Sequence, residues 1–219
     1  MNAVTTTTGE QYGVGKIVCV GRNYAAHAAE LGNEVPEFPL IFIKPASALV
    51  FDGMSITKPA YSDDMHHEVE LVLLIGKNLK NVTPEEAQKG IAGYGVGLDM
   101  TLRDVQNELK KKGHPWTIAK CFDTSAAVSD FILSKHCTIT SDARISLTVN
   151  GVVRQDAPLS LMLFDPAKVV SYISQKMTLE PGDLIFTGTP EGVAKVVPGD
   201  VLSAKVAGIP ELRVTVEAE

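Results

Sequence analysis

Cysteine, basic charge and long hydrophobic runs are all scarce in this sequence, and each shortage excludes a class of protein. The 219 residues include three cysteines, none of them in a CxxC pair, so we expect buried free thiols in a reducing cytoplasm and no disulfide framework or zinc site. The net charge of −6 at pH 7 argues against binding to nucleic acid or to an anionic membrane surface. No apolar run approaches the roughly 20 residues of a membrane span. The N-terminal stretch has neither a basic nor an apolar region, so we expect no secretory signal and a cytoplasmic protein.

Hydrophobic residues are plentiful, at 45% of the chain against 21% charged residues, so the sequence can build a sizeable core. The length suits one large domain, over residues 16–219, preceded by a short N-terminal extension over residues 1–15. The threonine run at 5–8 is expected to be a frayed terminus. Strand patterns outnumber helical patterns and do not alternate with them regularly. This predicts an α+β fold with a β-rich core.

Local signals place the elements that carry the polar motifs. Thr83, followed by proline and two acids, predicts a helix start, and Gly113 predicts a helix end. The Asn150–Gly151 pair predicts a tight hairpin. A short alanine-rich helix should follow the first strand and end at Gly32. The main predicted strands are 16–21, 40–45, 69–77 and 93–101, and the main predicted helices cover 22–31, 83–92, 103–112 and the segment after Asp165.

Two glutamates lie one residue apart in the aliphatic strand HHEVELVLLIGK. Alternate strand residues face the same side, so Glu68 and Glu70 should project together, with Cα atoms roughly 6.7 Å apart. Two neighbouring buried carboxylates repel each other unless a cation or a proton intervenes. A hard divalent cation relieves both charges. The alternative is a half-solvated strand, with the glutamates in water and Val69 and Leu71 in the core.

Asp99, at the end of a glycine-rich strand, could supply a third carboxylate. Three acidic oxygen donors suit Mg²⁺ or Mn²⁺ better than zinc. Asp99 could instead cap the helix that follows it. A competing metal site would use His66, His67 and Glu68 as two histidines and one carboxylate around iron. Adjacent strand residues face opposite sides, however, so the two histidines would have difficulty sharing one metal ion.

The alanine-rich helix carries His27 and Glu30, three residues apart and therefore on one face. A carboxylate that orients an imidazole is a common general-base arrangement, although a solvated surface pair is the alternative. Lys120 has apolar neighbours and could stabilise an anion, or it could be a surface lysine with a buried stem.

Two further features could contact a substrate. Arg103 and Gln106 share one helix face and could bind a carboxylate and a carbonyl, or could lie on the exterior. The loop TGTPEGV at 187–193 directly follows an apolar strand. Such loops often line binding sites, although an ordinary turn is the alternative.

The order of these motifs resembles the fumarylacetoacetate hydrolase family over residues 16–216. The stretches that carry the likeness are VGRNYAAHAAE, FIKP, HHEVELVLLIG, AGYGVGLDMTLRDVQ, AKCFDTSA and GDLIFTGTPEGV. The chain is most similar to the short branch that cleaves acylpyruvates and decarboxylates oxaloacetate. The resemblance implies a β-rich roll of layered mixed sheets with a short lid helix, usually in a homodimer.

The resemblance also implies roles for ten residues. The metal ligands would be Glu68, Glu70 and Asp99, binding Mg²⁺ or Mn²⁺. The catalytic residues would be the lid pair His27 and Glu30 together with Lys120, and the substrate-binding residues would be Arg103, Gln106, Thr189 and Lys44.

The expected activity is hydrolysis of the carbon–carbon bond of 2,4-dioxo acids, such as acetylpyruvate or fumarylpyruvate, to pyruvate and a carboxylic acid. Decarboxylation of oxaloacetate is the expected side activity. One alternative is isomerisation, decarboxylation or hydration of 2-oxo-dienoates from aromatic catabolism. Another is a non-catalytic, metal-binding dimeric module. The sequence leaves the acyl group open.

Overall fold

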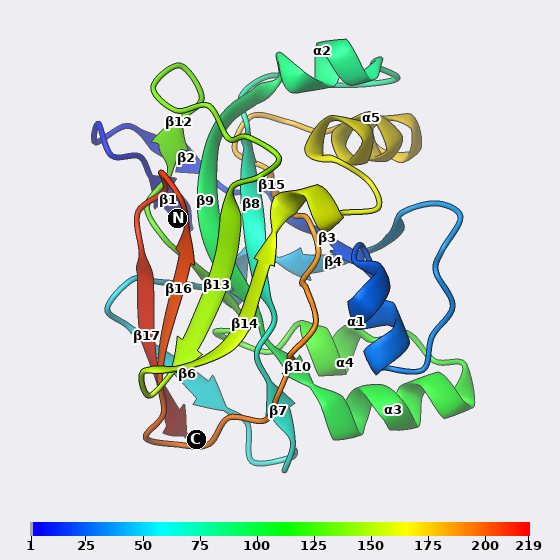
Figure 1. The fold of residues 1–219 in the computed structure, drawn as a ribbon, viewed down its shortest axis with the longest axis vertical. Helices are drawn as coiled ribbons and strands as arrows, with labels where there is room; N and C mark the ends of the chain where they lie inside the picture. The colour runs from blue at the N-terminus through cyan, green and yellow to red at the C-terminus, as the bar shows by residue number, and fades with distance from the viewer. Residues whose placement is uncertain (1) are drawn as a thin grey trace.

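The computed structural model describes residues 2–219, which form two packed sheets with short helices at one side (Figure 1). The large sheet has the strand order β4-β3-β15-β8-β9-β11-β5, with β12 paired to β9, and the smaller sheet has the order β14-β13-β16-β17-β6. The strands of the large sheet are β3 (Lys16–Gly21), β4 (Leu40–Pro45), β5 (Leu49–Phe51), β8 (Val69–Ile75), β9 (Ile91–Asp99), β11 (Ala126–Val128), β12 (Ile132–Leu133) and β15 (Leu184–Phe186). Those of the smaller sheet are β6 (Ser55–Lys58), β13 (Arg144–Val149), β14 (Val152–Pro158), β16 (Val201–Val206) and β17 (Leu212–Ala218).

The remaining elements are short. Two additional antiparallel pairs are β1 with β2 and β7 with β10. Helices α1, α3 and α4 lie together beside one end of the sheets, and α2 and α5 lie at the other end (Figure 1). The bounds are β1 (Ala3–Thr5), β2 (Gln11–Gly13), β7 (Met65–His66), β10 (Thr101–Leu102), α1 (Ala25–Glu30), α2 (Pro84–Gln88), α3 (Arg103–Lys112), α4 (Thr117–Lys120) and α5 (Pro166–Lys176), with single 3-10 turns at Ala46–Ala48 and Leu159–Leu161.

Strand β8 is a nearly continuous apolar run because both of its faces are buried. Strands β13 and β16 pack on β8 and β9, and Leu71 and Leu73 of β8 belong to the large apolar cluster that includes both sheets. Val72 and Leu74, which alternate with them, belong to a second apolar cluster. A strand buried on both faces has no solvated side. The predicted α+β class with layered, β-rich sheets is therefore confirmed.

The N-terminal threonine run is ordered, so the expectation of a frayed terminus is wrong. Strands β1 and β2 form a hairpin in which Thr5 pairs with Gln11. Phe131 N donates to Thr5 O at 2.9 Å, and Thr7 N donates to Phe131 O at 2.9 Å. Val4 is buried in the second apolar cluster. The hairpin thus packs on the domain because its own apolar residue completes that cluster.

Several predicted boundaries are confirmed by their local geometry. Thr83 caps α2 in a reciprocal capping box with Glu86, and Gly113 ends α3 in the left-handed region. Asn150 and Gly151 have φ values of 52° and 79°, as a type I′ hairpin turn requires. The predicted helix over 22–31 is shorter in the structure, because α1 begins only at Ala25.

Within residues 2–219, no helix combines the length and the apolar character needed to cross a membrane. The three cysteines are free thiols. Cys19 is buried as expected, whereas Cys121 and Cys137 are only partly buried.

Candidate active site

The register of the central sheet brings three carboxylates together. Val69 pairs with Leu98 across β8 and β9, and Asp99 N donates to Glu68 O at 2.9 Å, so Asp99 lies directly opposite Glu68. Glu70 follows two residues later on the same face. One carboxylate oxygen from each residue lies within 4.8 Å of the others. All three side chains are buried, with exposed fractions of 5% or less, so the half-solvated alternative for Glu68 and Glu70 is wrong.

Two of the three carboxylates are neutralised by basic side chains. Lys120 Nζ donates to Glu68 Oε2 at 2.8 Å and to Asp99 Oδ2 at 2.7 Å. Arg103 Nη2 donates to Glu68 Oε1 at 2.5 Å, and Lys44 Nζ lies 2.8 Å from Asp99 Oδ1 without the alignment of a hydrogen bond. Buried charges persist only when they are paired in this way.

The pKa values follow from these contacts. Burial alone would raise the pKa of the Glu68 carboxyl, but Lys120 and Arg103 hold it well below its ordinary range. Burial disfavours the ammonium form of Lys120, but Asp99 and Glu68 outweigh that effect and raise its pKa. Glu68 and Lys120 are therefore both ionised at neutral pH.

Glu70 is the carboxylate without a basic partner. Among residues 2–219, its only hydrogen bond comes from Gly188 N, at 2.6 Å from Glu70 Oε2. Burial, together with the charges of Asp99 and Glu68, raises the pKa of Glu70 well above its ordinary value. Three convergent carboxylates with one left uncompensated are a donor set that fits a hard divalent cation such as Mg²⁺ or Mn²⁺. The residues present therefore fit the predicted metal.

Position 188, whose N–H group binds Glu70, requires glycine. Its φ is 100°, and a Cβ there would lie 2.6 Å from Asn23 Cβ. The buried Asn23 side chain in turn donates to Thr187 O at 2.7 Å and to Phe164 O at 2.9 Å. Asn23, which precedes α1, is thereby hydrogen-bonded to Thr187 in the loop after β15, and the next residue of that loop, Gly188, binds Glu70.

His27 and Glu30, which the sequence places on one helix face, are in contact. His27 Nδ1 lies 3.3 Å from Glu30 Oε2, and Gly192 N donates to Glu30 Oε1 at 3.0 Å. The His27 side chain is almost fully buried, whereas Glu30 is exposed, so only the Glu30 side of the pair is solvated. Burial lowers the pKa of His27, and the charges of Glu68 and Glu30 only partly offset this effect. His27 is consequently neutral at physiological pH and able to accept a proton.

One pocket collects most of the predicted site residues. Arg103 Nη1 donates to Gln106 Oε1 at 2.7 Å, and both side chains are buried, so neither lies on the exterior. Thr189 is also buried, so its loop is more than a surface turn. The predicted residues that line the pocket are His27, Glu68, Glu70, Asp99, Arg103, Gln106, Lys120 and Thr189.

Two predicted residues do not line this pocket. Glu30 contacts it through His27. Lys44, expected to bind substrate, is fully buried beside Asp99, and its ammonium donates to Ser125 O at 2.9 Å, to Met100 O at 3.1 Å and to Lys120 O. Its donors are directed at protein groups, so the structure gives Lys44 a supporting place rather than a substrate contact.

The competing metal and cap interpretations fail on geometry. His66 Nε2 lies 3.0 Å from Asp64 Oδ1, and His67 Nδ1 lies 3.0 Å from Gln155 Oε1, so the two imidazoles have separate partners. The N-cap of α3 is Leu102, with no side-chain cap, so Asp99 does not cap that helix. Over residues 2–219, the carboxylate triad is the one cluster with metal-ligand spacing.

Gln155, on β14, was not predicted, yet it supports two parts of the site. Its Oε1 accepts from Val69 N at 3.1 Å and from His67 Nδ1, and its Nε2 donates to Thr189 Oγ1 at 2.8 Å and to Pro190 O at 2.8 Å. Because Thr189 Oγ1 accepts this bond, its own hydrogen can be donated into the pocket. The only sequence signal was a polar residue in the strand after the hairpin turn.

Replacing Gln155 by methionine should lower the free energy of unfolding by about 2–4 kcal/mol, because several buried polar groups lose their partner. Chemical denaturation measures the change. The matched control is Gln88→Met, since Gln88 is exposed and has one side-chain bond, to Tyr94. Equal losses in the two variants would contradict the supporting role of Gln155.

Comparisons with known proteins show what this chain is similar to. Residues 16–217 match the family model for the fumarylacetoacetate (FAA) hydrolase C-terminal region. The chain is 45% identical over 201 residues to the mitochondrial oxaloacetate tautomerase FAHD1 of Rattus norvegicus, covering 92% of this chain and 91% of that protein.

Two solved structures have the same fold. A fumarylpyruvate hydrolase from Pseudomonas aeruginosa, in complex with Mn²⁺ and pyruvate, superimposes with a TM-score of 0.95 at 39% identity, covering 99% of this chain and 96% of that one. A 5-carboxymethyl-2-hydroxymuconate delta-isomerase from Mycobacterium smegmatis has a TM-score of 0.84 at 41% identity, covering 94% of this chain and 80% of that one. The three relatives carry the names of three different reactions.

Proposed function

Because this chain belongs to the fumarylacetoacetate hydrolase family, we propose that it hydrolyses the carbon–carbon bond of acylpyruvates, with a divalent metal ion, to pyruvate and a carboxylic acid. The observation that carries the proposal is the convergence of the carboxylate triad, Lys120 and His27 on one buried pocket. The carboxylate triad and Lys120 suit the 2-oxo acid end of the substrate, and His27 suits activation of a water molecule that attacks the 4-carbonyl.

Glu68, Glu70 and Asp99 would hold Mg²⁺ or Mn²⁺, which would act as a Lewis acid toward the 2-oxo acid group of the substrate. Lys120 supplies fixed positive charge at the same place. Two of its three N–H donors are directed at Glu68 and Asp99, which leaves one for an oxygen atom of the substrate. Stabilising an enolate oxygen by such a preorganised donor is where most of the rate gain should arise.

His27 accepts a proton from water, whose oxygen forms a bond to the 4-carbonyl carbon. The bond between carbons 3 and 4 then breaks, and its electron pair passes to the 2-oxo oxygen as an enolate. Protonation of carbon 3 gives pyruvate, and the acyl group leaves as a carboxylate. Glu30 orients the imidazole of His27. Arg103, Gln106 and the Thr189 hydroxyl position the substrate. Lys44 supports the site by its contacts with Asp99 and with the main-chain oxygen of Lys120.

The lid must move during this cycle. The pocket has a free volume of about 30 Å³, far below the roughly 300 Å³ or more of an ordinary small-molecule site. A substrate therefore needs the site to open, and the proposed movement is separation of α1 from the loop at Gly192, which α1 contacts through Glu30. Closure afterwards excludes all water except the attacking molecule.

The second candidate is interconversion of the keto and enol forms of oxaloacetate. It is favoured by the 45% identity to the rat tautomerase, and it would use the same enolate-stabilising groups with His27 moving a proton at carbon 3. Decarboxylation of oxaloacetate remains the expected side activity. The dienoate chemistry has support from the Mycobacterium smegmatis isomerase structure. The homodimer also stays a prediction.

A two-readout assay separates these reactions. Acetylpyruvate and the enol form of oxaloacetate are each mixed with enzyme and Mg²⁺, while enol absorbance and released pyruvate are followed together. Hydrolysis removes acetylpyruvate absorbance with equal formation of pyruvate. Loss of oxaloacetate enol absorbance without pyruvate would support the tautomerase instead. Metal binding with no reaction of any 2-oxo acid would support the non-catalytic module.

The pH dependence provides a further prediction. A general base must be neutral, and burial lowers the pKa of His27 below its ordinary value of 6.5, so kcat/KM should decline only below pH 6.5. The Glu30 hydrogen bond and charge raise the pKa of His27. Glu30→Gln should therefore move the acid limb to lower pH while reducing the rate at pH 8 by about 10-fold or more. A shift to higher pH would contradict the pairing of His27 with Glu30.

A further inference from the structure

One face of α3 presents a row of polar side chains to the pocket. Arg103, Gln106 and Lys110 follow one another at positions i, i+3 and i+7, and all three line the pocket. Lys110 stands two turns from Arg103, about 10 Å along the helix axis. Arg103 is buried against Glu68, whereas Lys110 is only half-buried. The row therefore runs from the carboxylate triad toward the mouth of the pocket.

At that outer end lie two cations that the proposed mechanism does not use. Arg22 also lines the pocket and is half-buried. Within residues 2–219, neither Arg22 nor Lys110 forms an ion pair, and neither side chain forms a hydrogen bond. Arg103, in contrast, is neutralised by Glu68. Two half-buried basic groups that share one pocket without an acidic partner present uncompensated positive charge to whatever enters it.

Both residues have unusual local environments. Lys110 Nζ lies 5.4 Å from the centre of the Trp116 ring, a cation–π contact that limits its freedom. Burial and the positive charges of Arg103 and Arg22 lower the pKa of Lys110, which reflects the proximity of the three groups. Arg22 has a left-handed backbone, with φ of 59°, a conformation uncommon for residues other than glycine and often found at functional sites.

We propose that Arg22 and Lys110 bind a second carboxylate at the far end of the substrate, so that the preferred acylpyruvate carries an acidic acyl group such as fumaryl. This inference rests on the proposed function, which places the 2-oxo acid at the triad and the acyl group beyond His27. A carboxylate accepts charge-assisted hydrogen bonds from arginine and lysine, and these bonds are about twice as strong as neutral ones.

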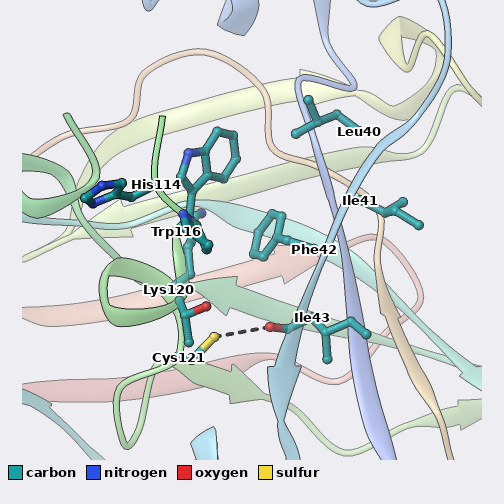
Figure 2. A pocket seen from close by; sticks show the side chains of 10 residues that line it. Leu40, Ile41, Phe42, Ile43, His114, Trp116, Lys120 and Cys121 are labelled. Carbon is teal, nitrogen blue, oxygen red and sulfur yellow. Dashed lines mark hydrogen bonds between the residues drawn. The ribbon is translucent and has the colours of Figure 1, made fainter. Parts of the chain in front are cut away.

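A neighbouring cavity is the rival place for the acyl group. It has a volume of about 370 Å³ and shares Phe42, Trp116 and Lys120 with the pocket. Figure 2 shows the β4 residues Leu40 to Ile43 opposite His114, Trp116 and Cys121, with the Phe42 ring on the side of Trp116. Most of its lining is apolar, with His114 and Lys120 as the basic exceptions, so it suits an apolar acyl group better than the Arg22–Lys110 end of the pocket does. The two sites therefore predict opposite preferences between substrates that differ only in charge.

The test compares fumarylpyruvate with crotonylpyruvate, in which a methyl group replaces the distal carboxylate. The wild type should have the higher kcat/KM for fumarylpyruvate. Lys110→Met and Arg22→Asn should each reduce the ratio of the two kcat/KM values by about 10-fold or more, mainly through KM. Asparagine tolerates the left-handed backbone at position 22. Lys112→Met, on the same helix but exposed, should leave the ratio unchanged, and Arg22→Lys should restore most of it.

Turnover of crotonylpyruvate reports that each variant is folded. A wild-type preference for crotonylpyruvate would overturn the inference in favour of the apolar cavity. Equal losses on both substrates would also overturn it, because the two cations would then act on the 2-oxo acid end. Failure of the wild type to hydrolyse either compound would instead remove the proposed function, and the inference with it.

Discussion

Glu70→Gln is expected to reduce acylpyruvate hydrolysis by about 10³-fold or more, because the loss of one carboxylate ligand removes most of the metal's contribution to the transition state. Glutamine keeps the shape of the side chain, so the hydrogen bond from Gly188 N can still be accepted by its carbonyl oxygen. Oxaloacetate decarboxylation should fall together with hydrolysis, since both require the same stabilised enolate. Steady-state rates at saturating Mn²⁺ measure both losses.

The same substitution should have the opposite effect on the metal-free protein. Burial and the charges of Asp99 and Glu68 raise the pKa of Glu70, which means that its ionised form destabilises the fold. Glu70→Gln should therefore melt at the same or a higher temperature than the wild type in EDTA. When Mn²⁺ is added, the melting temperature of the wild type should rise, whereas that of Glu70→Gln should not. Glu85→Gln, at an exposed position, is the control and should behave as the wild type does.

A Glu70→Gln variant that kept both the Mn²⁺-induced rise in melting temperature and its activity would exclude Glu70 as a ligand. A variant that lost stability in EDTA would contradict the electrostatic argument but leave the ligand assignment intact. The two readouts therefore separate metal binding from the cost of the buried charge.

His27→Gln is expected to reduce hydrolysis by about 10²- to 10⁴-fold, the usual contribution of a positioned general base. Decarboxylation of oxaloacetate should fall much less, because loss of CO₂ needs no activated water. His27 does not belong to the carboxylate triad, so the Mn²⁺-induced stabilisation should persist. Rates of pyruvate release from acetylpyruvate and from oxaloacetate are compared under identical conditions.

Equal losses in the two reactions would argue against water activation and would favour a role for His27 in moving a proton at carbon 3. That outcome would move the account toward the tautomerase. The control is His136→Gln, an exposed histidine distant in sequence from every site residue, which should change neither rate.

Part of this site follows directly from the sequence, and part depends on register. The period of two along β8 was enough to predict that Glu68 and Glu70 share a face. The pairing of Asp99 with Glu68 depends on the register of β8 and β9, which no local pattern specifies. Its place at a strand end made Asp99 a candidate third ligand, and the family resemblance implied the same role. The sheet register then explains why Asp99 lies opposite Glu68.

The residues that were missed or misplaced have partners far away in the chain. Gln155 contacts residues at positions 67 and 189, so its polar side chain gave no local sign of a role. Lys44 was expected to bind substrate, but its ammonium is enclosed by main-chain oxygens from later segments. The threonine run was expected to fray. Its main-chain partner is Phe131, and the sequence alone does not reveal this distant pairing.

The most direct test of the central claim is the release of pyruvate and fumarate from fumarylpyruvate by the metal-free protein, measured before and after Mn²⁺ is added. The account predicts equal amounts of the two products, formed only with the metal and abolished by EDTA. Undiminished release in EDTA, or no release by protein that Mn²⁺ demonstrably stabilises, would contradict it.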